Sequence, residues 1–154
     1  MNINHSFGHL RDCVLIVDDD AMIADLWCMT LEDMGLEVCG SAATAAEAID
    51  LARAHRPWLV LMDVRLRGEP DGIDAAIAIH ASVECQVIFI TCSSEPSTAQ
   101  RMQACHPAAV LIKPVSDRQL QSAITTAIRT IMRHKFLEAS RPVAQTKQTS
   151  HCGN

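Results

Sequence analysis

Charged and hydroxyl side chains follow four short apolar segments of the chain. The polar residues that come directly after these segments are Asp18, Asp19, Asp20, Asp63, Thr91 and Lys113. If the segments are parallel strands of an α/β protein, their carboxyl ends meet at one edge of the sheet, where such folds bind ligands. We therefore expect carboxylates, a hydroxyl and an ammonium group to converge on one site.

The chemistry of such a site follows from its charges. Asp18, Asp19 and Asp63 would repel one another, and this repulsion would raise the pKa of at least one carboxyl group unless a cation were bound. Mg²⁺ prefers carboxylate oxygens and commonly completes its shell with water and substrate phosphate. In that setting a carboxylate can attack phosphorus to form an acyl phosphate, while Lys113 supplies positive charge and Thr91 supplies a hydroxyl donor.

Each of these residues also has a simpler explanation. An acidic residue is favourable at a helix N-terminus, and we assign this capping role to Asp20. Asp63 alone could be a turn residue, and Lys113 alone could be a solvated charge. These separate explanations do not account for polar residues at the ends of successive strands, so the grouped site is the preferred interpretation.

The elements that must position the site are predicted from apolar patterning. The predicted strands cover residues 14–17, 36–40, 59–62, 87–90 and 110–112. Between and after them we predict helices over about 23–34, 44–54 and 73–80, within 97–105, and from 116 to beyond 131. This alternation predicts an α/β fold, a doubly wound five-stranded parallel sheet in the order 2-1-3-4-5.

Helical spacing also predicts which side chains face the core. Leu26 belongs to the expected inner stripe of the first helix, and the expected inner stripe of the third helix consists of Ile73, Ala76, Ile77 and His80. His80 is interpreted as a partly buried packing residue rather than a ligand. Gly35 is expected to end the first helix, and capping-box spacing is expected to begin the helices after Thr44 and Ser116.

Length, composition and net charge restrict which classes of function are possible. The 154 residues suit one domain, and no apolar stretch approaches the roughly 20 residues that span a bilayer. The N-terminus lacks a secretion signal, so a cytoplasmic location is expected. The seven cysteines show no metal-binding spacing and are expected to be reduced, and the net charge of −5 with dispersed basic residues argues against direct nucleic-acid binding.

The domain organisation is expected to be simple. Residues 1–11 would form an N-terminal extension and residues 12–137 the folded domain. Residues 138–154 are polar without apolar periodicity, so we predict a mobile C-terminal tail that is too short to be an output domain.

Five segments together resemble the receiver domain of bacterial two-component response regulators, over about residues 12–134. They are Val14-Leu15-Ile16-Val17-Asp18-Asp19-Asp20, Leu59-Val60-Leu61-Met62-Asp63-Val64-Arg65-Leu66, Asp71-Gly72, Ile88-Phe89-Ile90-Thr91 and Lys113-Pro114. The resemblance implies a flavodoxin-like fold and a chemotaxis-receiver-like single domain that takes a phosphoryl group from a histidine kinase or a histidine phosphotransfer protein.

The resemblance also implies a role for each matching residue. Asp63 would be the phosphoacceptor. Asp19, Asp63 and the backbone carbonyl of Arg65 would bind Mg²⁺, with Asp18 acting mainly through water. Lys113 would pair with the phosphoryl oxygens and be joined to Pro114 by a cis bond, and Thr91 would follow the phosphoryl group on activation.

Two positions depart from the common receiver pattern. Val110 stands where most receivers carry Tyr or Phe as a rotamer switch, and the chain has no tyrosine. The loop from Asp63 to Gly72 is about one residue longer than usual, with Arg67 where proline is frequent. A swinging aromatic therefore cannot be the switch at position 110, whereas the expected metal ligands precede the altered loop.

The resulting hypothesis is that the chain is a stand-alone response regulator receiver and not an enzyme. It would switch an unknown downstream partner or relay phosphate. We expect it to contact neither nucleic acid nor membrane. A phosphatase of the haloacid dehalogenase type is disfavoured, because it needs Asp two residues after its nucleophile and this chain has Arg65 there. Nucleotide binding is disfavoured by the absence of the glycine-rich phosphate-binding motifs. A phosphorylation-independent interaction module remains the alternative because of Val110.

Overall fold

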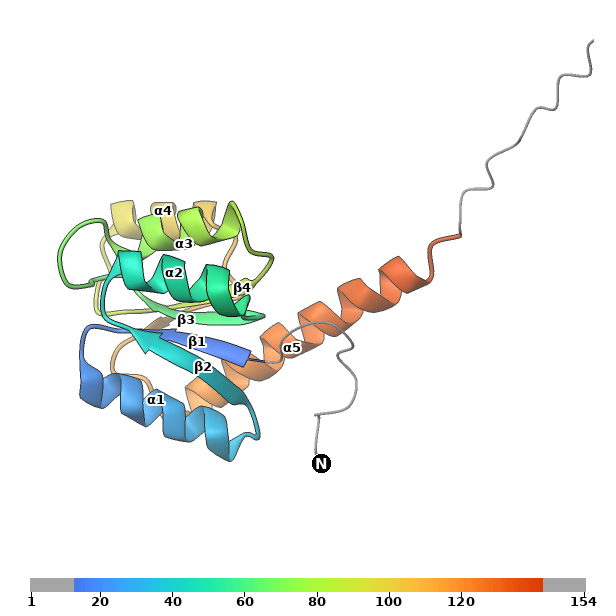
Figure 1. The fold of residues 1–154 in the computed structure, drawn as a ribbon, viewed down its shortest axis with the longest axis horizontal. Helices are drawn as coiled ribbons and strands as arrows, with labels where there is room; N and C mark the ends of the chain where they lie inside the picture. The colour runs from blue at the N-terminus through green and yellow to red at the C-terminus, as the bar shows by residue number, and fades with distance from the viewer. Residues whose placement is uncertain (1–12, 143–154) are drawn as a thin grey trace, which may run out of the picture.

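A computed structural model describes residues 13–142 as five strands alternating with five helices. The strands are β1 (Cys13–Val17), β2 (Glu37–Ala42), β3 (Leu59–Asp63), β4 (Gln86–Thr91) and β5 (Ala109–Ile112). The helices are α1 (Ala21–Asp33), α2 (Ala45–His55), α3 (Gly72–His80), α4 (Pro96–Ala104) and α5 (Asp117–Ala139). All neighbouring strands are parallel in the order β2-β1-β3-β4-β5 (Figure 1), which confirms the predicted fold.

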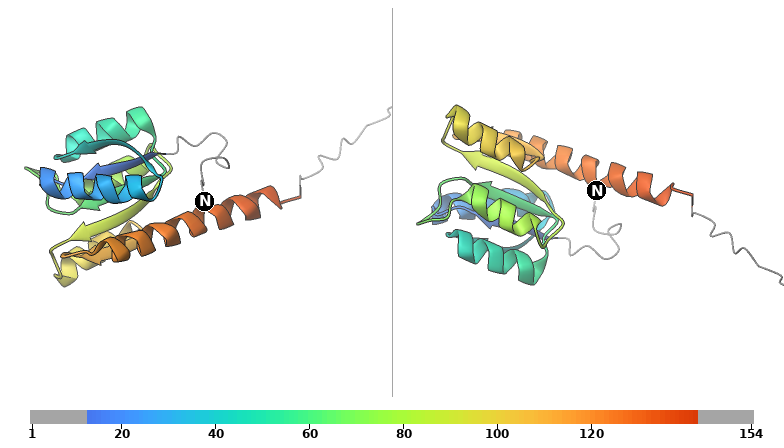
Figure 2. Two further views of the ribbon diagram at one scale, coloured as in Figure 1. Left: turned by 90° about the horizontal axis from the view of Figure 1, so that it is seen from below. Right: turned by 90° about the horizontal axis from the view of Figure 1, so that it is seen from above.

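Helices cover both faces of the sheet, which explains the continuous apolar runs of the central strands. Helices α1 and α5 lie on one face, and α2, α3 and α4 lie on the other (Figures 1 and 2). Every residue of β1 and β3 is buried as a result. Strand β5 lies at the sheet edge and is only partly buried.

The predicted helix ends agree with the capping chemistry of the structure. The side chain of Asp20 accepts hydrogen bonds from the first turn of α1, and Thr44 caps α2 in the same way. Ser116 and Gln119 form a reciprocal capping box at the start of α5. Gly35 follows α1 with φ +77°, the left-handed conformation that glycine adopts without steric cost.

Some element bounds differ from the prediction. Strand β2 runs to Ala42 rather than Gly40, because it pairs with β1 as far as Val17. Helix α4 begins at Pro96, whose ring suits the first helical turn. Helix α5 continues to Ala139, so Glu138 and Ala139 are helical although their sequence has no apolar periodicity.

The prediction of which side chains of α1 and α3 face the core is partly wrong. Leu26 is 48% exposed and Ile77 is 56% exposed, and His80 is exposed rather than a packing residue. Helix α3 is apolar around most of its circumference, so spacing alone could not choose its buried face. Ile73 and Ala76 are buried as predicted, and Ala75 and Ile79 are buried with them.

Two predictions fall wholly or mainly beyond the described part of the chain. The expected extension, residues 1–11, lies outside the described residues, as does segment 143–154 of the expected mobile tail. Within residues 13–142, no helix is both long and apolar enough to cross a membrane.

Candidate functional site

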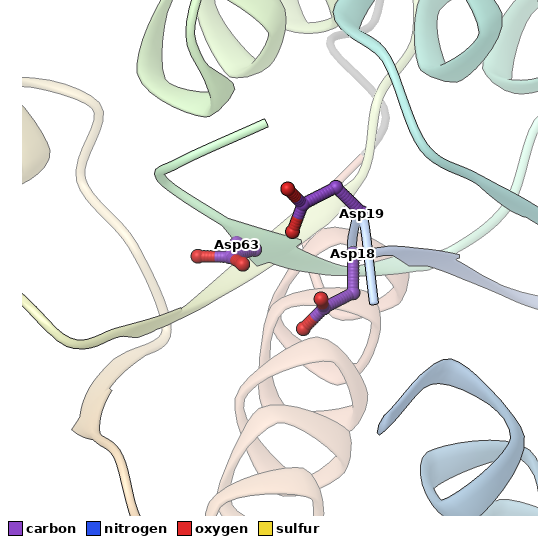
Figure 3. Close-up of side chains that lie close together, drawn as sticks. All are labelled: Asp18, Asp19 and Asp63. Carbon is purple, nitrogen blue, oxygen red and sulfur yellow. The ribbon is translucent and has the colours of Figure 1, made fainter. Parts of the chain in front are cut away.

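The site lies at the carboxyl-terminal edge of the sheet, where β1 and β3 end next to each other. Asp18 and Asp19 follow β1, and Asp63 is the last residue of β3. Figure 3 shows the three carboxylate groups gathered around this edge. Asp18 and Asp63 are buried, whereas Asp19 is exposed. The structure therefore brings together the three carboxylates that the sequence analysis grouped.

Lys113 joins two of these carboxylates. Its Nζ atom lies 2.9 Å from Oδ2 of Asp18 and 3.1 Å from Oδ2 of Asp63. The Lys113 side chain is 14% exposed, against 2% and 7% for the two aspartates. Both distances are in the range of charge-assisted hydrogen bonds, so a single ammonium group offsets the charge of two buried carboxylates.

Burial and charge act in opposite directions on the ionisation of these groups. Burial raises the pKa of Asp63 above its ordinary value, and it outweighs the opposing effect of Lys113. Burial alone would lower the pKa of Lys113, but the hydrogen bond to Asp18 and the charge of Asp63 raise it overall. Lys113 is therefore firmly protonated, and ionised Asp63 depends on nearby positive charge.

Backbone groups hold the two buried carboxylates in place. Oδ1 of Asp18 accepts from the backbone N–H of Asp20 at 2.9 Å. Oδ1 of Asp63 accepts from the backbone N–H of Arg65 at 3.2 Å. Each carboxylate thus has one oxygen fixed by the loop that follows its own strand and the other oxygen directed at Lys113.

The same cluster has the donor set of a site for a hard cation. Ligand oxygens of Asp18, Asp19 and Asp63 all lie within 4.8 Å of one another. The cluster contains no cysteine or histidine, and all-oxygen coordination suits Mg²⁺ rather than Zn²⁺. The residues present therefore fit the cation that the sequence analysis expected.

Thr91 ends β4 and is completely buried. Its Oγ1 atom accepts from the backbone N–H of Ser93 at 3.0 Å, and its carbonyl oxygen accepts from the backbone N–H of Lys113 at 2.8 Å. Ser93 Oγ in turn accepts from the backbone N–H of Glu95 at 3.3 Å. A chain of hydrogen bonds therefore links Thr91 to the residue that precedes α4, and a direct bond links it to Lys113.

The loop between β3 and α3 passes very close to the site. The backbone N–H of Gly72 donates to the carbonyl of Val64 at 2.8 Å. A Cβ atom at Gly72 would lie 1.8 Å from the backbone oxygen of Asp63, a separation that no side chain allows. Glycine is required here because the start of α3 packs directly against the residue expected to be the phosphoacceptor.

An ion pair beside this loop could not be predicted from the sequence. Arg101 of α4 donates to both carboxylate oxygens of Asp71, at 2.7 and 3.1 Å, and to Asp74 at 3.1 Å. Asp71 also caps α3 by accepting from the backbone of Ile73 and Asp74. The Asp71-Gly72 motif was recognised, but no local pattern pointed to Arg101, because the contact requires α3 and α4 to lie side by side.

The sequence matches a described protein family over most of the folded part. Residues 14–125 match the response regulator receiver domain. The chain is 36% identical over 115 residues to the transcriptional regulatory protein PdtaR of Mycobacterium tuberculosis, an alignment covering 75% of this chain and 56% of that protein. It is 34% identical over 118 residues to the phyllosphere-induced regulator PhyR of Methylorubrum extorquens, covering 75% of this chain and 43% of that protein.

Solved structures give the same result. The signal receiver domain of a modulated diguanylate cyclase from Desulfovibrio desulfuricans is 34% identical, with a TM-score of 0.74, covering 79% of this chain and 97% of that one. A CheY-like receiver domain protein from Methanospirillum hungatei is 26% identical, with a TM-score of 0.75, covering 80% and 98%.

The relatives are regulators, and the chain spans about half the length of the curated relatives it matches. What it shares with them is the folded segment that carries Asp18, Asp63, Thr91 and Lys113. The chain therefore belongs to the response regulator receiver domain family.

Proposed function

We propose that the protein is a phosphoryl-accepting receiver of a two-component phosphorelay, with Asp63 as the acceptor. The observation that carries this proposal is the position of Lys113, whose ammonium group contacts both buried carboxylates at the ends of β1 and β3. An ammonium group placed there can pair with a phosphoryl oxygen as soon as one is attached to Asp63.

The proposed reaction is a phosphoryl transfer between two nucleophiles. A carboxylate oxygen of Asp63 forms the new bond to phosphorus, and the phosphorus–nitrogen bond of a donor phosphohistidine breaks. The electron pair of that bond leaves with the imidazole, so the product is an aspartyl phosphate and a dephosphorylated donor. Lys113 offsets the negative charge on the transferred group, and the backbone N–H of Arg65 keeps the carboxylate oriented.

We further propose that Asp18, Asp19 and Asp63 hold Mg²⁺, together with the backbone carbonyl of Arg65. Mg²⁺ would supply charge neutralisation for the carboxylates and the transferred phosphoryl group. The convergence of three carboxylates supports this proposal. So does the raised pKa of Asp63, because burial disfavours its charged form and a nearby cation would favour it.

The proposed switch starts at Thr91. Its hydroxyl would donate to an oxygen of the phosphoryl group, and the bond from Ser93 to Thr91 would carry this movement into the loop before α4. Val110 lies opposite Phe89 in the sheet and packs against the core, so it offers no aromatic ring to swing with the hydroxyl. We therefore assign the readout to residues 91–95 and α4.

Partner binding follows from this proposal. The donor would be a histidine kinase or a histidine phosphotransfer protein, and the receiver would act as a switch or relay rather than as a classical enzyme. The stand-alone organisation expected from the sequence stays a prediction, because the curated relatives are longer than the segment that they share with this chain.

One experiment tests the proposed acceptor. The purified protein is incubated with acetyl phosphate and Mg²⁺ and run on a phosphate-affinity gel, beside Asp63→Asn and a sample with EDTA. Asp20→Asn is the matched control, because Asp20 lies at the same sheet edge but caps α1 and Asn also caps helices. We expect a retarded band in the wild type and in Asp20→Asn, and none with Asp63→Asn or EDTA.

The valine at position 110, where most receivers carry an aromatic switch residue, favours one competing function, a phosphorylation-independent interaction module. Beryllofluoride, which mimics a phosphoryl group on aspartate, separates the two. A bound fluorine NMR signal that requires Mg²⁺ and Asp63 supports the phosphoacceptor. The competing function is supported if neither acetyl phosphate nor beryllofluoride produces an Asp63-dependent signal.

A further inference from the structure

Helix α1 carries an apolar stripe that no other segment of the described residues 13–142 covers. Met22, Leu26 and Met29 are 82%, 48% and 62% exposed. Their spacing of four and then three residues places them on one side of the helix. The buried residues of α1, such as Trp27 and Leu31, lie on the opposite side. We call these three exposed residues the α1 stripe.

Acidic side chains border the α1 stripe. Asp25 lies one helical turn from Met22 and from Met29, and Glu32 and Asp33 lie one turn after Met29. All three are exposed, and α1 contains no lysine or arginine. The outer side of α1 is therefore apolar along its centre and negatively charged at its rim.

The end of α5 carries a second apolar stripe. Ile128, Met132 and Phe136 are spaced four residues apart, and we call them the α5 stripe. Ile128 still packs partly against the core, whereas Met132 is 40% exposed and Phe136 is 72% exposed. Figures 1 and 2 show that this part of α5 runs past the end of the sheet.

Basic side chains border the α5 stripe. Arg129 lies one turn before Met132, and Arg133 lies one turn before Phe136. Both are exposed. From residue 128 to residue 141 the sequence has four lysine or arginine residues and one acidic residue, Glu138. The α5 stripe thus has the same construction as the α1 stripe, with charge of the opposite sign.

The two stripes of one chain cannot meet. Thr30 of α1 contacts Asp117, the first residue of α5, through a 3.1 Å hydrogen bond. Phe136 lies 19 positions further along this continuous helix, which at 1.5 Å per residue is roughly 28 Å away. Figure 1 shows α5 directed away from α1 beyond that first contact.

We propose that the α1 stripe of one chain binds the α5 stripe of a second copy of the same chain. Each copy offers both surfaces, so two copies can make the contact twice and close into a dimer. Apolar burial would supply affinity, and the opposite charges at the rims would select this pairing over the pairing of like stripes. This inference does not rest on phosphorylation of Asp63.

Charge reversal gives a test with built-in controls. One variant, Asp25→Lys with Glu32→Lys, makes both stripes of the chain basic at the rim. The other, Arg129→Glu with Arg133→Glu, makes both stripes acidic. All four residues are exposed, so the fold should survive, and circular dichroism together with fluorescence of buried Trp27 and Trp58 checks this. The control Asp50→Lys with Glu84→Lys changes the net charge by the same amount and sign as the first variant, at exposed positions outside both stripes.

Sedimentation velocity of the full chain over a range of concentrations gives the readout. We expect a monomer–dimer equilibrium for the wild type and the control, weakened by added salt. Each charge-reversed variant alone should have a dissociation constant raised at least about tenfold, because like charges then face each other. An equal mixture of the two variants should recover the dimer as a heterodimer, since every contact again joins opposite charges.

Four results would overturn the inference. The first is a wild type that stays monomeric up to hundreds of micromolar. The second is a dimer that the α1 variant leaves intact while the α5 variant abolishes it, which would mean that α5 stripes pair with each other. The third is two monomeric variants whose mixture forms no heterodimer. The fourth is a loss of phosphotransfer in the α1 variant with an unchanged oligomeric state, which would assign that stripe to a kinase instead.

Discussion

Lys113 donates a 3.1 Å hydrogen bond to Asp63, a residue 50 positions earlier in the chain. The contact exists because β3 and β5 are both parallel strands that end at the same edge of the sheet. Lys113 therefore acts on the charge of Asp63 only in the folded protein. The stability of the sheet and the chemistry of the site are coupled through this bond.

The first prediction concerns removal of the shared ammonium group. Lys113→Met leaves Asp18 and Asp63 buried without their cationic partner, so we expect a loss of about 3 kcal/mol in the free energy of unfolding. Mg²⁺ should stabilise this variant more than it stabilises the wild type, because it would offset the same carboxylates. Urea unfolding with and without Mg²⁺ measures both effects.

A surface control is available for this prediction. Arg118→Met removes an exposed positive charge from α5 and should change the stability by no more than about 0.5 kcal/mol. An unfolding midpoint of Lys113→Met equal to that of the wild type would mean that the ammonium group contributes nothing to the stability of the site.

The second prediction concerns Gly72. In Gly72→Ala, a Cβ atom would meet the backbone oxygen of Asp63 at 1.8 Å, so the start of α3 must move away from the site. We expect a destabilisation of about 3 kcal/mol and weaker Mg²⁺ binding. Gly35→Ala is the matched control: Gly35 has φ +77° but open space around it, so this change should cost only about 1 kcal/mol and leave Mg²⁺ binding intact.

The third prediction concerns the ion pair between Asp71 and Arg101. Burial alone would raise the pKa of Asp71, but the hydrogen bonds from Arg101 and from the backbone of Asp74 outweigh it and lower the pKa below the ordinary 3.8. The unfolded chain binds the proton more tightly, so the stability from this group is present above pH 3.8 and is lost as the pH falls through the folded pKa.

Arg101→Met should therefore destabilise the protein at neutral pH and have a smaller effect in acid. It should also return the pKa of Asp71 toward 3.8, which an NMR titration of the side-chain carboxyl carbon measures. An unchanged Asp71 titration in Arg101→Met would show that the ion pair is not maintained in solution.

The fourth prediction concerns thiol reactivity. Burial raises the pKa of the Cys39 and Cys85 thiols to about 12, whereas Cys92 is exposed. At about pH 8, iodoacetamide should modify Cys92 in the native protein and leave Cys39 and Cys85 untouched until urea unfolds it. Peptide mapping by mass spectrometry reads each position separately. Rapid native labelling of Cys85 would contradict the buried environment of that thiol.

The strand order and the grouped site could be predicted from the sequence because they depend on strong local signals. Continuous apolar runs such as Val14–Val17 indicate strands buried on both faces, and parallel topology then brings Asp18 and Asp63 together. Capping by Asp20 could be predicted for the same reason, since the residue type and the position act within one turn.

Features that depend on packing between distant elements could not be predicted. Arg101 meets Asp71 only because α4 lies beside α3, and nothing near either residue in the sequence encodes that contact. Ile77 and His80 fitted the same helical stripe as the buried Ile73 and Ala76, but α3 is apolar on several sides and tertiary packing buries Ala75 and Ile79 in their place. Helix α5 extends to Ala139 although its end buries little, so apolar periodicity underestimated its length.

Chemical trapping can show directly whether Asp63 becomes phosphorylated. Borohydride reduces an aspartyl phosphate to homoserine, which peptide mass spectrometry locates by residue. After treatment with acetyl phosphate and Mg²⁺, we expect homoserine at position 63, lost with EDTA and unaffected by Asp20→Asn. Homoserine at another aspartate, or its absence from a sample that the phosphate-affinity gel shows to be phosphorylated, would contradict the assignment of Asp63 as the acceptor.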